Sequence, residues 1–174
     1  MRILLTDGNY KHSLGAARSL ASNGHLVDVI GPKYCLARYS KFVNRLVDVQ
    51  DNFNEERFHI CLKFLEIERY DVLMPIGAKS VLLVSKQRDL IEPLVHLAVA
   101  AAESISICMD KFRTANFAKS IGISVPRTWE FRSLDELKEN ISSLDYPLVL
   151  KNRSETEIVV PTGAATGFTL PIVA

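Results

Sequence analysis

Short apolar runs alternate along the first hundred residues with segments whose apolar positions recur every three or four residues. Such runs are typical of strands buried on both faces, and the three-to-four periodicity is typical of amphipathic helices. Strand, helix and strand in regular alternation predict an α/β fold with an open, doubly wound, Rossmann-like parallel sheet. The predicted strands cover 2–6, 25–30, 46–49, 71–76 and 95–99, and the predicted helices cover 14–22, 55–70 and 78–92.

Local signals mark the ends of the first predicted helix. Ser13 precedes its first apolar position and is expected to cap its N-terminus. Asn23-Gly24 follows its last apolar position, which is typical of a helix C-terminus. On the second predicted helix, the positions expected to face inward are Phe58, Cys61, Leu62 and Leu65.

The pattern changes near residue 109. Asp110-Lys111 begins a predicted helix that Gly122 ends, and an extended segment follows at 127–131. Ser133, with Glu136 three residues later, predicts the capping box of another helix. The last predicted strand is 147–151. We therefore expect a Rossmann-like domain at 1–109 and the beginning of an α+β unit at 110–174.

Composition and charge exclude several classes of protein. The chain of 174 residues is 48% hydrophobic and 24% charged, with a net charge of +1, which favours a globular core and gives no general attraction to nucleic acid or to acidic membranes. Three cysteines without CxxC spacing argue against a disulfide framework and a zinc site. We find neither a signal peptide nor a transmembrane run, so we expect a cytoplasmic protein without membrane or nucleic-acid partners.

Candidate binding residues lie where predicted strands end. Asp7, Gly8 and Asn9 follow the first strand, and Gly77 follows the fourth; we predict that they bind substrate, because ligands of doubly wound sheets bind at this edge. The alternative is an ordinary connection with a helix cap. A dinucleotide site, and with it an NAD-dependent oxidoreductase, is disfavoured by the single glycine of the first loop. Asp28 also lies inside the second strand instead of at its end.

Two lysines occupy positions that are unfavourable for stability alone. Lys111 stands at a helix N-terminus, where a cation opposes the helix dipole, and Lys151 ends an apolar strand. Two cations delivered by separate elements suit a polyphosphate, and the alternative is a pair of ordinary solvated lysines. The four histidines show no ligand spacing, so no metal site is predicted in this chain.

DKFRTANFAKSIGISVPRTW, followed by YPLVLK, resembles the ATP-grasp ligases, in the branch that includes short relatives of the carbamoyl-phosphate synthase large subunit. The preceding hundred residues resemble the pre-ATP-grasp domain of that family, so that the resemblance covers about residues 1 to 153. It implies that Lys111 and Lys151 contact ATP phosphates. It also implies that a small-molecule carboxylate is joined to an amine or a thiol through an acyl phosphate, with ATP and Mg²⁺.

The end of the chain departs from the family pattern. Residues 158–174 contain no charged side chain and thus no carboxylate for Mg²⁺, and Gly163 and Gly167 are at most a degraded glycine-rich flap. We therefore expect an N-terminal fragment of a ligase that is not catalytic alone, whose metal ligands lie elsewhere. Another chain or a second copy is expected to cover the apolar tail. The alternative is a non-catalytic Rossmann-like module that binds a ligand or a partner, and no catalytic residue is assigned.

Overall fold

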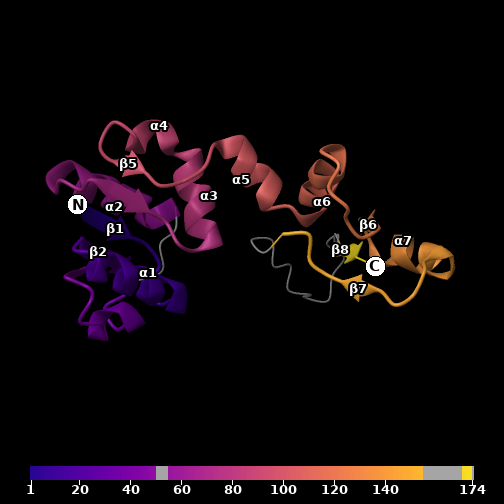
Figure 1. Cartoon of the computed structure of the whole chain (residues 1–174), viewed down its shortest axis with the longest axis horizontal. Coiled ribbons are helices and arrows are strands. Elements are labelled where there is room, and N and C mark those ends of the chain that lie inside the picture. Colours follow the sequence, from indigo (N-terminus) through magenta and orange to yellow (C-terminus); the bar gives the residue numbers. More distant parts are fainter. Residues whose placement is uncertain (50–54, 155–169, 174) are drawn as a thin grey trace. The chain divides into compact units, whose positions relative to one another are not determined.

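The computed structural model describes residues 1–49, 55–154 and 170–173. They fall into two compact units, Met1–Ala102 and Glu103–Ala174, which Figure 1 shows along one chain. Each unit has its own sheet. The domain boundary predicted near residue 109 lies inside the second unit, just after its first helix.

The first unit is built on a parallel sheet of five strands in the order β3-β2-β1-β4-β5. Strand β1 is central, β2 and β3 are added on one side of it, and β4 and β5 are added on the other. The direction in which strands are added therefore reverses between β1 and β4. In such sheets ligands bind at the carboxyl ends of the two strands that flank this reversal, and we call this side of the sheet the ligand edge. This architecture confirms the predicted α/β fold class. The strands are β1 (Arg2–Leu5), β2 (Leu26–Gly31), β3 (Arg45–Asp48), β4 (Val72–Met74) and β5 (His96–Leu97).

In the described part of this unit, four helices and one short 3₁₀ helix connect the strands. The predicted helix at 78–92 is interrupted at Gln87 and forms two helices, because the backbone of Gln87 leaves the helical conformation. The elements are α1 (Lys11–Ser22), η1 (Leu36–Tyr39), α2 (Glu55–Ile67), α3 (Ala78–Lys86) and α4 (Arg88–Ile91).

The predicted N-cap of the first helix is wrong. Helix α1 begins at Lys11, ahead of Ser13, which is fully buried inside the helix. The Ser13 hydroxyl lies 3.0 Å from the carbonyl oxygen of Thr6 and 2.6 Å from that of Asp7, so it donates to the end of β1 instead of accepting from the helix. The predicted C-terminus is confirmed, since Gly24 follows the helix at a φ of 79°.

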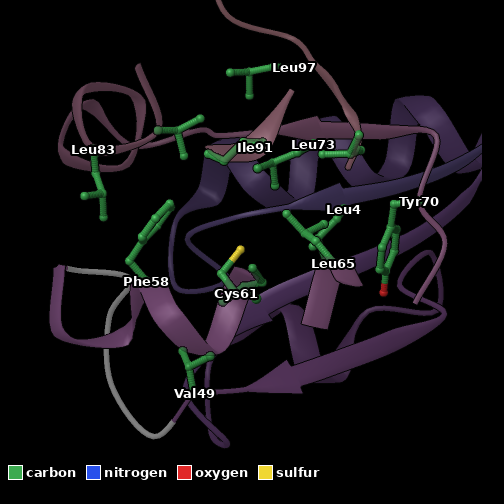
Figure 2. Close-up of a cluster of buried hydrophobic side chains, with 13 residues drawn as sticks. Leu4, Val49, Phe58, Cys61, Leu65, Tyr70, Leu73, Leu83, Ile91 and Leu97 are labelled. Carbon is green, nitrogen blue, oxygen red and sulfur yellow. The ribbon is translucent and has the colours of Figure 1, made fainter. Parts of the chain in front are cut away.

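Both faces of the sheet are buried, which explains the continuous apolar runs. Leu4 belongs to a cluster on one face, shown in Figure 2, while Ile3 and Leu5 belong to a second cluster on the other. Neighbouring residues of a strand point to opposite faces, so β1 serves both clusters. The predicted inward positions of α2 are confirmed for Phe58, Cys61 and Leu65, which are buried, and Leu62 is half-buried against the same cluster.

The three cysteines differ in their surroundings. Cys35 and Cys61 are buried, and burial raises the pKa of the Cys61 thiol to about 12. Cys108 is exposed. A thiol with a raised pKa is held in its neutral, unreactive form, which fits Cys61 as a packing residue.

A charged cluster surrounds Asp28, the third residue of β2, which lies three residues before the carboxyl end of that strand. Asp28 is fully buried there and accepts hydrogen bonds from Arg2 (2.9 Å), Tyr70 (2.6 Å) and Asn44 (2.8 Å). Burial by itself raises the pKa of Asp28, but the three hydrogen bonds outweigh it and leave that pKa below its ordinary value. Asp28 is therefore held as an anion by residues of other segments of the chain.

The second unit contains an antiparallel sheet of three strands in the order β6-β8-β7. Asp110 caps α6 by accepting from the Arg113 N–H at 2.9 Å, and Ser133 caps α7 by accepting from the Glu136 N–H at 3.1 Å. The Glu136 carboxylate accepts in turn from the Arg132 N–H, one residue before the cap. The elements are α5 (Ala102–Cys108), α6 (Lys111–Ser120), β6 (Thr128–Phe131), α7 (Leu134–Asn140), η2 (Ile141–Ser143), β7 (Val149–Leu150) and β8 (Leu170–Val173).

Two elements of this unit were not predicted. Helix α5 precedes the expected boundary, and β8 makes 147–151 the second-last strand instead of the last. Strand β8 lies between β6 and β7 and pairs with both, so the end of the apolar tail forms the middle of the sheet. Gly163 and Gly167, the glycines compared with a flap, lie outside the described residues.

Candidate functional site

The loops that follow β1 and β4 meet at the carboxyl edge of the first sheet. The Asp7 carboxylate accepts hydrogen bonds from the backbone N–H of Gly77 at 2.7 Å and from the hydroxyl of Ser80 at 2.8 Å. The Thr6 hydroxyl donates to the same carboxylate and accepts from the Ile76 N–H at 3.0 Å. Asp7, in the loop after β1, thus binds Gly77 and Ser80 at the start of helix α3, and two of the predicted substrate-binding positions, Asp7 and Gly77, are brought together.

The two glycines of this edge are required by close packing. A Cβ on Gly8 would lie 2.8 Å from the Cys35 sulfur, and a Cβ on Gly77 would lie 2.8 Å from a ring carbon of Tyr10 and 3.0 Å from the Asp7 carboxyl carbon. Asn9 is exposed beside them. The edge is therefore tightly built, with the Asp7 oxygens engaged inside the protein, and a substrate-binding role for these residues stays a prediction.

The second candidate site surrounds the start of α6. The backbone N–H of Lys111 donates to the carbonyl oxygen of Arg153 at 3.0 Å. The guanidinium of Arg153 binds the Asp110 carboxylate at 2.6 Å and also the Glu130 carboxylate. It lies 6.0 Å from the ring centre of Phe112. One arginine therefore joins the start of α6, strand β6 and the segment that follows β7.

This arrangement brings together the two chain segments that carry the predicted phosphate-binding lysines. Lys151 is exposed and lies two residues before Arg153, whereas Lys111 is half-buried and follows the cap residue Asp110. Neither lysine forms an ion pair with any acidic residue that the structure describes. The positive charge of Arg153, in contrast, is paired with the carboxylates of Asp110 and Glu130.

Sequence reasoning missed the Arg153 clamp, by which we mean Arg153 with Asp110, Glu130 and the Lys111 N–H. A signal was present, because Arg153 follows Lys151 at a spacing of two immediately after an apolar strand. Such a residue emerges from the same face of extended chain as the lysine. Its partners lie on other elements, however, and only the folded chain identifies them.

A cavity of about 400 Å³ also lies in the second unit, between α6 and β6. Lys119 and Arg127 contribute positive charge to its wall, and the Arg127 guanidinium lies 5.7 Å from the ring centre of Trp129. Its other walls come from α6 and from the segment that leads into β6. Neither Lys111 nor Lys151 lines it, so this cavity is separate from the predicted phosphate-binding lysines.

The described residues contain no group of three or more His, Cys, Asp or Glu side chains that could hold a metal ion. The sequence-based expectation places the Mg²⁺ ligands elsewhere, and it stays a prediction. Among the helices of the described ranges, none is both long enough and apolar enough to cross a membrane.

No protein-family model and no curated protein sequence matches this chain. Solved structures are similar, however. N5-carboxyaminoimidazole synthetase from Staphylococcus aureus, complexed with ADP, superposes with a TM-score of 0.66 at 16% identity over 99% of this chain and 46% of that one. The N5-carboxyaminoimidazole ribonucleotide synthetase from Thermus thermophilus gives 0.68 at 17% identity, over 98% and 46%.

L-amino acid ligase from Bacillus licheniformis gives a TM-score of 0.67 at 17% identity, over 88% of this chain and 36% of that one. These proteins belong to the ATP-grasp superfamily. This chain spans less than half the length of each of the three. It therefore has the fold of the N-terminal part of ATP-grasp proteins, as the sequence resemblance predicted.

Proposed function

We propose that this chain is the N-terminal part of an ATP-grasp ligase, which joins a carboxylate to an amine or a thiol through an acyl phosphate. The fold likeness to ATP-grasp proteins supports the proposal. The observation that carries it is the Arg153 clamp, which fixes the Lys111 segment against the Lys151 segment while leaving both lysines without an acidic partner among the described residues. Two such cations on neighbouring segments suit the phosphates of ATP.

The contribution of this chain is to bind and orient the nucleotide. Lys111 and Lys151 offset the negative charge of the phosphates, and the clamp limits the freedom of the backbone that carries them. A nucleotide phosphate that is held in a fixed place loses less entropy when it reacts. We assign no catalytic residue in this chain, and we propose that it is not catalytic alone.

Mg²⁺ assists phosphoryl transfer by neutralising phosphate charge. The described residues do not fit a magnesium site, because no suitable group of acidic side chains is found in them. We therefore derive no step through the metal, and we place its ligands in another part of the ligase.

For the substrates, we propose small carboxylate and amine molecules that bind at the carboxyl edge of the first sheet. The carboxylate of Asp7 already accepts from Gly77 and Ser80, so Asp7 would shape this edge and exposed Asn9 would contact the substrate. The buried free thiols of Cys35 and Cys61 suit a reducing compartment, and we propose the cytoplasm.

An ATP titration followed by calorimetry tests the two lysines. The chain is titrated with ATP and Mg²⁺ beside its Lys111→Ala and Lys151→Ala variants. Each substitution is expected to weaken ATP binding about tenfold or more, since a hydrogen bond to a charged group contributes roughly 1.5 to 3 kcal/mol. The matched control is Lys138→Ala, an exposed lysine of α7 in the same unit, which should leave the affinity unchanged.

Two results would contradict the proposal. ATP binding that persists in the Lys111→Ala, Lys151→Ala double variant would show that these lysines do not bind the phosphates. A chain that is folded by circular dichroism and binds no ATP would show that the described half of the site does not hold nucleotide.

A further inference from the structure

The connection between β2 and β3 is basic and aromatic. From Pro32 to Val47 the sequence contains no acidic residue but carries Lys33, Arg38, Lys41 and Arg45. The net charge of the whole chain is only +1, so this positive charge is local. We refer to residues 32–42 as the basic–aromatic loop.

Small buried residues hold this loop against the ligand edge of the first sheet. Cys35 and Ala37 are buried, and the Ala37 N–H donates to the carbonyl oxygen of Gly8 at 3.0 Å. A further backbone hydrogen bond joins the Cys35 N–H to the carbonyl oxygen of Pro32 at 2.9 Å. Because the small side chains face inward, the large ones between them face outward.

The outward side chains include two rings that are exposed to an unusual degree. Tyr34 is 74% exposed and Tyr39 is 75% exposed. Exposed apolar surface of this kind is unfavourable in water, and tyrosines that remain on a surface are enriched where other molecules bind. The loop therefore presents ring surface next to the edge where ligands of this fold class bind.

Positively charged side chains lie near the rings of Tyr34 and Phe42. Lys33 Nζ and Arg38 Cζ lie 5.6 Å and 5.8 Å from the ring centre of Tyr34. Lys41 and Arg18 lie at 5.3 Å and 5.7 Å from that of Phe42. In the ranges that the structure describes, no ion pair joins any of these four cations to an acid. A cation–π contact at an exposed site contributes only about 0.5 to 1 kcal/mol. The rings therefore do not offset the repulsion between these neighbouring positive charges as an acidic side chain would.

We propose that the basic–aromatic loop binds a phosphorylated small molecule that carries a planar ring, a nucleoside monophosphate being the simplest example. The phosphate would bind between Lys33 and Arg38, because a guanidinium fork and an ammonium both donate to phosphate oxygens. The planar ring would stack on Tyr39, which follows Arg38 in the chain and is 75% exposed. This site belongs to the first unit and does not depend on the ATP-binding role proposed for Lys111 and Lys151.

The test is a calorimetric titration with adenosine 5′-monophosphate. It is carried out on the full chain with Lys111→Ala and Lys151→Ala already in place, so that the proposed ATP site does not contribute. Lys33→Gln, Arg38→Gln and Tyr39→Ala are then added one at a time. Each cation variant is expected to weaken binding about tenfold. Adenosine keeps the planar ring but lacks the phosphate, and ribose 5-phosphate keeps the phosphate but lacks the ring. Both should therefore bind more weakly than the monophosphate.

Lys63→Gln is the matched control, because it removes one positive charge from α2 in the same unit. Unchanged affinity in this control, with weakened binding in the loop variants, is the expected result. The proposal is overturned if the monophosphate does not bind, if the loop variants bind it as the parent does, or if Lys63→Gln weakens binding equally. Binding that occurs only while Lys111 and Lys151 are intact would assign the nucleotide to the second unit and also overturn it.

Discussion

The backbone N–H of Lys111 donates to the carbonyl oxygen of Arg153 at 3.0 Å, so the first turn of α6 is fixed to the segment that leaves β7. The side chain of Arg153 strengthens this junction through Asp110 and Glu130. The position of Lys111 relative to Lys151 thus depends on a residue that we do not expect to touch the nucleotide. Arg153 is a positioning residue in this proposal.

Replacing Arg153 by alanine should lower both the stability of the second unit and its affinity for ATP. The substitution leaves two partly buried carboxylates without their cation, which costs about 1 to 3 kcal/mol. Thermal melting and ATP calorimetry measure the two effects. Arg153→Lys should restore part of the melting temperature and less of the ATP affinity, because an ammonium cannot reproduce the forked contact.

Arg127→Ala serves as the control for this arginine. Arg127 pairs with Asp145, but both side chains are more than half exposed, and such surface pairs contribute about 0 to 1 kcal/mol. Its melting temperature should therefore remain close to that of the parent. Equal losses in Arg127→Ala and Arg153→Ala would contradict the positioning role.

Replacing Asp28 by asparagine should destabilise the first unit by about 3 kcal/mol, because the substitution keeps the shape of the side chain but removes the buried anion that Arg2 and Tyr70 contact. Thermal melting followed by circular dichroism measures the loss. Asp89→Asn, on the short helix α4, is a matched control, since no ion pair within the described ranges involves Asp89. An unchanged melting temperature in Asp28→Asn would contradict the structural importance of this cluster.

The same cluster predicts how stability depends on pH. Asp28 faces Arg2, Arg45, Tyr70 and Asn44, and its pKa in the folded protein is lowered. The unfolded chain therefore binds a proton at a higher pH than the folded chain does. The stability due to Asp28 is present above the unfolded pKa, about 3.9, and is lost as the pH falls through the lowered folded value.

Melting temperatures of the parent and of Asp28→Asn between neutral and acidic pH test this sign. The gap between the two proteins should narrow as the pH falls below about 4. Glu68 also has a lowered pKa, caused by its hydrogen bonds from Arg2 and Arg45, and it remains in both proteins. The comparison therefore removes the part of its contribution that does not depend on Asp28. A gap that stays constant down to acidic pH would contradict the prediction.

Gly77→Ala should destabilise the ligand edge of the first sheet. The added Cβ would lie 2.8 Å from a ring carbon of Tyr10 and 3.0 Å from the carboxyl carbon of Asp7, so one of them must move. Such overpacking typically costs about 1 to 3 kcal/mol. Chemical denaturation is the measurement.

Gly15→Ala is the control for this glycine, because it lies inside α1 and a Cβ there meets nothing within 4 Å. In a helix interior, alanine is favoured over glycine by about 0.5 to 1 kcal/mol. The two substitutions should therefore change stability in opposite directions. A stabilising Gly77→Ala would show that the edge is more loosely packed than the structure indicates.

Local patterns in the sequence determined most of the secondary structure and the class of the first unit. The runs at β1, β2 and β4 and the periodicity of α2 are properties of neighbouring residues, and burial on both faces of a parallel sheet leaves such runs in any chain. The capping role of Ser133 was also predicted from the sequence, because a capping box depends only on residues that are three positions apart. The prediction that Lys111 and Lys151 bind phosphate began from their unfavourable positions in a helix and a strand, and the family resemblance added the order and spacing of the two motifs.

Only the tertiary structure decided which distant residues meet. Ser13 was predicted as a cap but donates to the end of β1, and Arg153 binds Asp110 across 43 positions of sequence. Strand β8 is the central strand of the second sheet, although the sequence of the tail does not alternate between apolar and polar residues as a half-buried strand does. A local sequence pattern indicates which face of a helix or strand is apolar. It does not indicate which group a polar side chain will bind, because that partner is determined by how the helices and strands pack. The free energy of a buried hydrogen bond depends on both the donor and the acceptor.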